Sequence, residues 1–111
     1  MVADPSATEF SGYSLADEPA VLSLRGATPN PFARETSIRF GLPAEGAVNL
    51  GVFDVQGRHL ATLASGTMRA GWHSVRWSGT DRNGSPVQAG VYFVRLQFAR
   101  EAQVKRIVLT R

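Results

Sequence analysis

Few residues of this 111-residue chain have side chains suited to catalysis or metal binding. It has two histidines, His59 and His73, and no cysteine. A serine, a histidine and a carboxylate together perform acyl transfer. The chain contains such groups, in Ser65, Ser74, Ser78 and Asp54. No Gly-x-Ser-x-Gly turn presents any of these serines, so we expect both histidines to be ordinary surface or core residues. The sequence therefore predicts a protein that is not an enzyme.

A second candidate is the segment Asp81-x-Asn83-Gly84-Ser85, which has the composition of the start of a calcium loop. Helix–loop–helix calcium sites also need a glycine at their sixth position and a closing glutamate, and both are missing here. A plain turn is the favoured interpretation. We accordingly predict no metal site and no cofactor.

The charges are distributed unevenly. Residues 1–24 carry four acidic groups and no basic ones, whereas the whole chain has a net charge of +3 and a pI near 10.2. Single basic residues are spread over the predicted strands, and three more gather at the end: Arg39, Arg58, Arg76 and Arg95, then Lys105, Arg106 and Arg111. Nucleic-acid sites combine a basic face with stacking aromatics, and this pattern lacks one. Nucleic acid is therefore not an expected partner.

No apolar run approaches the roughly 20 residues of a membrane helix, so no membrane span is expected. The start, MVADPSATEF, has neither a basic end nor an apolar segment and does not fit a signal peptide. If the domain is exported, the signal is expected upstream in a longer precursor.

The elements that would position these residues are strands. Residues 1–20, rich in serine, alanine, proline and acids, predict a linker or flexible amino-terminal tail, with an edge strand over 10–15 as the alternative. Residues 21–111 form the predicted domain, where apolar residues alternate in short runs. The predicted strands are 21–25, 37–42, 47–54, 58–64, 72–78, 90–98 and 102–110. About seven strands without a helix predict an all-β, immunoglobulin-like antiparallel β-sandwich.

Two turns and one connection between the strands contain residues with definite backbone preferences. Asp54–Gly57 and Asp81–Gly84 both place aspartate first and glycine fourth, as in type I turns closed by a left-handed residue. Pro29 and Pro31 predict a rigid crossing between the sheets, anchored by Phe32.

Alternation also predicts which side chains face the core. On strand 72–78 these are His73, Val75 and Trp77. Trp72 is expected to pack in the core, with a carbohydrate platform as the less favoured alternative. On strand 90–98, Tyr92 and the residues in phase with it face inward. Phe93 and Arg95 then point outward, as a contact surface or with Phe93 covered by the tail or a loop.

A family resemblance rests on five runs in order: PNPF (29–32), TSIRFGLP (36–43), VFDVQGRHL (52–60), AGWHSVRWSGTDRNGSPVQAGVYFVRL (70–96) and KRIVLTR (105–111). Together they resemble the immunoglobulin-like domain shared by bacterial flagellar hook-capping proteins and the type A C-terminal sorting domains of type IX secretion cargo. The resemblance covers residues 28–111. The basic-then-apolar ending favours the sorting group.

The resemblance implies that residues 21–111 are a C-terminal sorting domain of a secreted or cell-surface parent protein, which passes the periplasm and the outer membrane. Implied partners are the proteins of the secretion translocon or sorting machinery, the parent's upstream domains and, after processing, surface lipopolysaccharide. A structural or assembly module of the hook-cap or filament type is the alternative.

Combining resemblance and surface prediction gives the expected partner-binding residues: Arg58, Phe93, Arg95, Lys105, Arg106, Ile107, Val108, Leu109, Thr110 and Arg111. Within this set, Arg58 and the terminal strand have no evident folding role in the sequence.

Overall fold

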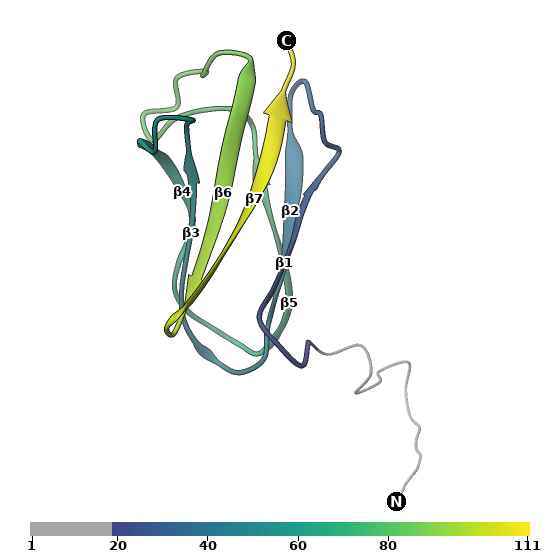
Figure 1. Cartoon of the computed structure of the whole chain (residues 1–111), viewed down its shortest axis with the longest axis vertical. Coiled ribbons are helices and arrows are strands. Elements are labelled where there is room, and N and C mark those ends of the chain that lie inside the picture. The colour runs from purple at the N-terminus through teal and green to yellow at the C-terminus, as the bar shows by residue number, and fades with distance from the viewer. Residues whose placement is uncertain (1–18) are drawn as a thin grey trace, which may run out of the picture.

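The computed structural model describes residues 19–111, which form an elongated sandwich of two antiparallel sheets (Figure 1). One sheet has three strands in the order β1-β2-β5, and the other has four in the order β4-β3-β6-β7. The strands are β1 Ser23–Thr28, β2 Thr36–Leu42, β3 Gly46–Phe53, β4 His59–Met68, β5 Gly71–Trp77, β6 Gly90–Phe98 and β7 Glu101–Leu109. The all-β prediction with seven strands in two antiparallel sheets is confirmed. The predicted linker and its edge-strand alternative fall almost wholly on residues 1–18, outside the described residues.

Strict alternation along the strands builds the core. Inward side chains such as Phe40 of β2, Leu50 of β3 and Val94 of β6 are fully buried, because each sheet presents one apolar face to the other. His73, Val75 and Trp77 lie inward as predicted, paired across β2 with core positions. The described part of the chain contains no helix that is long and apolar enough to cross a membrane.

The first strand lies later than the alternation predicts, at Ser23–Thr28 instead of 21–25. Leu22 and Leu24 are buried, but Val21 is 69% exposed and precedes the ladder. The strand continues past Arg25 because a β-bulge follows Leu24, with Gly26 at φ +90°. Glycine adopts this left-handed backbone without the cost that a Cβ would add.

The two aspartate turns share one geometry, as predicted. Asp54 Oδ1 accepts the amides of Gln56 and Arg58, and the Gly57 amide donates to the Asp54 carbonyl. In the second turn, Asp81 Oδ1 accepts the amides of Asn83 and Ser85 and the Gly84 amide closes the turn in the same way. Gly57 and Gly84 both have positive φ, which explains the glycine at the fourth position.

Tyr92 fixes the connection into β6. Its ring is buried and lies edge-on to Trp77, and its hydroxyl donates to the Gln88 carbonyl four residues earlier. This is the tyrosine corner that immunoglobulin-like sandwiches place near the start of a central strand.

The predicted crossing of the proline segment from one sheet to the other is wrong. Pro29 and Pro31 lie between β1 and β2, which pair within the same sheet. Both are preceded by cis peptide bonds. The segment instead lies along β7 of the other sheet, where Phe32 is 2% exposed and serves as the predicted anchor.

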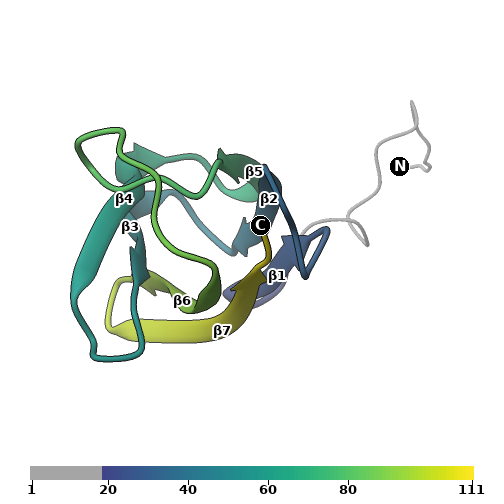
Figure 2. The same cartoon turned by 90° about the horizontal axis from the view of Figure 1, so that it is seen from above.

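Side chains close the gap between β1 and β7, which lie side by side in both views (Figures 1 and 2). The Gln103 amide donates to the Leu22 carbonyl (2.8 Å) and its Oε1 accepts the Leu24 amide (2.7 Å). Farther along β7, Asn30 Oδ1 accepts the Val108 amide and its Nδ2 donates to the Arg106 carbonyl.

Phe32 completes this closure through its backbone. Its amide donates to the Val108 carbonyl (2.9 Å), and its carbonyl accepts the Thr110 amide (2.7 Å). We call Gln103, Asn30 and Phe32, with the backbone groups they bind, the β1–β7 seam. The outer edge of β7 is therefore occupied from Arg106 to Thr110 and is not open to another strand there.

Candidate functional site

The outer face of the four-stranded sheet carries a row of rings. The strand register aligns His59 of β4, Phe53 of β3, Phe93 of β6 and Arg106 of β7. The Phe53 and His59 rings meet edge to face at 5.2 Å. Gly51 makes this possible, because a Cβ there would lie 3.3 Å from both rings.

Arg95 lies beside this row and covers part of it. Its guanidinium carbon is 4.5 Å above the Phe53 ring, a cation–π contact that holds the side chain across the sheet. In the register, Arg95 lies between Gly51 and Val104. Gly51, which has no side chain, thus leaves room for the Phe53 ring that Arg95 covers.

A hollow of about 270 Å³ opens among these residues. We call it the outer groove. Its lining consists of Phe53, Asp54, Val55, Gly57, Phe93, Arg95 and Val104. Val104 is 53% and Val55 68% exposed, whereas Phe93 is only partly buried. Apolar side chains gathered on a sheet face around one arginine have the composition of protein-contact surfaces, where aromatic residues and arginine are enriched.

Phe93 and Arg95 thus lie on the outer surface as predicted, and the structure adds Phe53 and Val104. The alternation along β3 already indicates that Phe53 faces outward, since it is out of phase with the inward Val48, Leu50 and Val52. Its neighbours across the sheet could not be read from one strand, because they depend on the register with β4 and β6.

The terminal strand requires a correction. Ile107 is fully buried and Leu109 is 1% exposed, so both belong to the core and the folded module does not present them to a partner. Thr110 donates its amide to the Phe32 carbonyl within the seam. Of the predicted set on this strand, Lys105 and Arg106 are exposed and Val108 is partly buried.

Arg111 and Arg58 also have folding roles that the sequence did not reveal. Arg111 donates to the carbonyls of Gly79 and Val87, which fastens the long connection before β6. Arg58 Nε donates to Asp54 Oδ2 at 2.8 Å. The Arg58 amide, and then its side chain, lower the pKa of Asp54 below the usual 3.8, against an opposing effect of burial. Binding by Arg58 or Arg111 stays a prediction.

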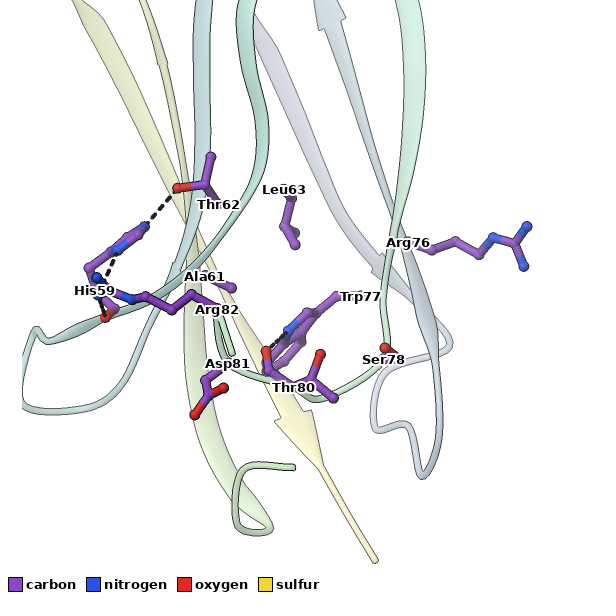
Figure 3. A pocket seen from close by; sticks show the side chains of 10 residues that line it. All are labelled: His59, Ala61, Thr62, Leu63, Arg76, Trp77, Ser78, Thr80, Asp81 and Arg82. Atoms are coloured by element: carbon purple, nitrogen blue, oxygen red, sulfur yellow. Dashed lines mark hydrogen bonds between the residues drawn. The ribbon is translucent and has the colours of Figure 1, made fainter. Parts of the chain in front are cut away.

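The histidines do not join a serine in the described residues. His59 Nε2 is 3.0 Å from the Thr62 hydroxyl, and His73 Nε2 is 2.8 Å from the Arg69 carbonyl. His59 and Ser78 both line an open pocket of about 470 Å³ but lie at opposite ends of it (Figure 3). Arg82 extends between them and donates to the His59 carbonyl.

The calcium-like segment is a turn whose carboxylate is engaged locally. Asp81 Oδ1 already accepts two amides of its own turn. Within residues 19–111, histidine and acidic side chains nowhere gather in a group of three that could hold a metal ion.

Trp72 does not pack in the core, contrary to the prediction. It is partly buried on the outer face of the three-stranded sheet, out of phase with the inward His73. The guanidinium groups of Arg25 and Arg39 lie 4.8 and 4.7 Å from the centre of its ring. The size of an indole favours burial, but the alternation of the strand decides which face it occupies.

Two packed antiparallel sheets and a tyrosine corner define an immunoglobulin-like β-sandwich module. The chain belongs to the FlgD Ig-like domain family, whose profile matches residues 28–101. A search of curated protein sequences finds no significant match.

Solved structures support the same fold. PorU of Porphyromonas gingivalis, in its dimeric latent form, matches with a TM-score of 0.63 at 16% identity, covering 80% of this chain and 9% of that one. FlgD of P. aeruginosa matches with a TM-score of 0.53 at 23% identity, covering 67% and 58%. PorZ of P. gingivalis, described as an essential bacterial surface component of the type-IX secretion system, matches at 0.54 and 20% identity, covering 86% and 12%. In each case the match spans less than two thirds of the other protein.

Proposed function

We propose that this chain is a non-catalytic recognition module that directs a secreted parent protein through type IX secretion and surface attachment. The outer groove carries the proposal. It gathers Phe53, Phe93 and Val104 around Arg95 on a face where the fold does not require large apolar side chains. Recognition would then take place through protein–protein contact on this face.

Two further observations support this function. PorZ is described as a component of the type-IX secretion system, and its matching domain shares this fold. The terminal strand also leaves Arg106 exposed while burying Ile107, so that one basic side chain adjoins Phe93 in the row of rings. The proposed partners are the translocon or sorting proteins, with surface lipopolysaccharide after processing, and the proposed location is the cell surface or exterior.

Assembly in a cap or filament is a second candidate. It is favoured by the family profile and by the match to FlgD of P. aeruginosa, of which this chain covers 58% compared with 9% of PorU. In this case the outer groove would contact a neighbouring copy. Sedimentation of the chain at increasing concentration tests this candidate, because assembly through the groove requires self-association that Phe93→Ser removes.

Export of a reporter tests the sorting function. A periplasmic reporter is fused before residues 1–111 in a bacterium with an active type IX system, and surface and medium fractions are assayed. Removing the terminal strand would be a poor test, since Ile107 and Leu109 belong to the core. Phe93→Ser removes a groove ring instead. We expect export to fall roughly tenfold or more, as for loss of a hot-spot side chain.

Val91→Ser is the matched control. Val91 lies two residues earlier on the same strand, is 37% exposed and does not line the outer groove. Its export should equal that of the unchanged fusion. Equal export of the Phe93 and Val91 variants would reject the groove, and failure of the unchanged fusion to leave the periplasm would reject the sorting function.

A further inference from the structure

The outer face of the three-stranded sheet carries a second cluster, made of Arg25, Arg39 and Trp72. The three residues come from three different strands, β1, β2 and β5. Both guanidinium groups lie within 4.8 Å of the centre of the same indole ring. We call this the arginine–tryptophan cluster.

Gly41 shapes the surface under this cluster. It pairs directly with Trp72 across the sheet, and a Cβ at Gly41 would lie 2.8 Å from the indole and from Pro19. Such a contact is too short for any side chain, so glycine allows the indole to lie against the strand. The ring is thereby held in one place, and it in turn orients the two arginines.

Among the described residues, 19–111, no acidic side chain neutralises the two positive charges of the cluster. Arg25 and Arg39 are exposed, and neither forms an ion pair within residues 19–111. Arg76 lies on the same face of the same sheet but pairs with Glu35 at 2.8 Å. Two like charges beside one ring repel each other, and an anion bound between them would relieve this repulsion.

We propose that the arginine–tryptophan cluster binds carboxylate groups of an acidic peptide segment on a partner protein. A guanidinium presents parallel N–H donors that match the two oxygens of a carboxylate. The contact with Trp72 restricts both arginines before binding, so less side-chain freedom is lost in the complex. This site is separate from the outer groove and does not depend on the proposed function.

An acidic peptide fits this site better than an anionic glycan. A sugar ring needs an open aromatic face on which to lie, whereas the Trp72 ring already has two guanidinium groups within 4.8 Å. What the cluster offers outward is charge and hydrogen-bond donors. Binding through these groups is expected to be strongly weakened by salt.

Calorimetric titration of the full chain tests the site. The probe is a peptide with four glutamates spaced by glycine and serine, and the same peptide with glutamines serves as its neutral counterpart. Asp17→Asn and Glu18→Gln are introduced in all samples so that carboxylates adjoining Pro19 do not compete. We expect the glutamate peptide to bind, and Arg25→Gln or Arg39→Gln each to weaken the Kd about tenfold.

Arg76→Gln is the matched control, since it removes an arginine of the same face that already has a partner. It should leave the Kd unchanged, and far-ultraviolet circular dichroism should show the same fold for all variants. Equal binding of the glutamine peptide, tighter binding of a heparin oligosaccharide, or an unchanged Kd in the Arg25→Gln, Arg39→Gln double variant would each overturn the proposal.

Discussion

The β1–β7 seam and the outer groove lie a few residues apart on β7, yet they use their side chains in opposite ways. In the seam, Gln103 and Asn30 each donate and accept a hydrogen bond, and Phe32 is almost fully buried. In the groove, Val104 and Phe93 retain exposed apolar surface. The seam residues therefore serve the fold, whereas the groove residues are available for contact with another molecule.

The residues that carry the family resemblance are therefore not the residues of the outer groove. The motif Pro29–Phe32 and the carboxyl-terminal Arg111 carry the resemblance, and their contacts fasten β7 and the connection before β6. Phe53 and Arg95, in contrast, make their ring contact on the outside of the sheet. Substitutions in the seam should lower stability first, and substitutions in the groove should lower recognition first.

The largest loss of stability is expected for Phe32→Ala. The substitution leaves a cavity under the seam next to Trp77, whose ring centre is 5.6 Å away. We expect the free energy of unfolding to fall by about 3–5 kcal/mol in urea titrations. Val55→Ala, on an exposed groove side chain, should change it by less than about 0.5 kcal/mol. Similar losses for both variants would remove the distinction between seam and groove.

Gln103→Ala should have the next largest effect. It leaves the Leu22 carbonyl and the Leu24 amide without their side-chain partner in a partly buried position. A loss of roughly 1–3 kcal/mol is expected from the two hydrogen bonds. Hydrogen exchange should locate the change at β1, with faster exchange of the Leu24 amide, while β3 and β4 stay protected. Uniformly faster exchange over all strands would show that the seam is not a local fastening.

Asp54→Asn tests the turn that borders the groove and should have a smaller effect, seen in its pH dependence. The pKa of Asp54 is lowered in the folded chain, mainly by the Arg58 amide, so the carboxylate stabilises the fold above pH 4. This contribution is lost as the pH falls through the lowered pKa. Melting temperatures from pH 7 to pH 2 should therefore fall less steeply in Asp54→Asn. Parallel curves for the two proteins would contradict this assignment.

Only a small effect on stability is expected for Phe93→Ser, the variant for which a large effect on export is proposed. The ring lies on the outer face and is only partly buried, so the free energy of unfolding should change by less than about 1 kcal/mol. Urea titration of the same variant used for export measures this. A loss comparable to that of Phe32→Ala would mean that the ring supports the fold and that the export defect follows from unfolding.

Much of the fold could be predicted because its causes are local. Alternation along Gly90–Phe98 determines which residues face the core, and the aspartate and glycine of each turn determine its shape. The seam could not be predicted in the same way. Asn30 and Gln103 meet partners 76 to 81 residues away, and a polar amide in a loop or on an edge strand gives no sign of which backbone it will bind.

The candidate sites were predicted only in part for the same reason. Phe93 and Arg95 were correctly placed outside, but their neighbour Phe53 depends on the pairing of β3 with β6. Trp72 shows two rules in conflict. Its size favours burial, whereas its phase relative to His73 puts it on the outer face, and the phase prevails because the strand pairs with β2 along its full length.

The seam also determines how this module bears force. Residues 22–32 and 103–110 run side by side in the same direction, with Gln103 bound to Leu22 and Thr110 bound to Phe32, so the start of β1 and the end of β7 lie at opposite ends of the sandwich (Figure 1). Tension applied at the two ends would slide β1 past β7 and load the bonds of Gln103, Asn30 and Phe32 together instead of one after another. Bonds loaded together in shear resist until all of them fail. The seam is accordingly arranged to resist tension in shear, as a mechanical clamp between the two ends of the described domain.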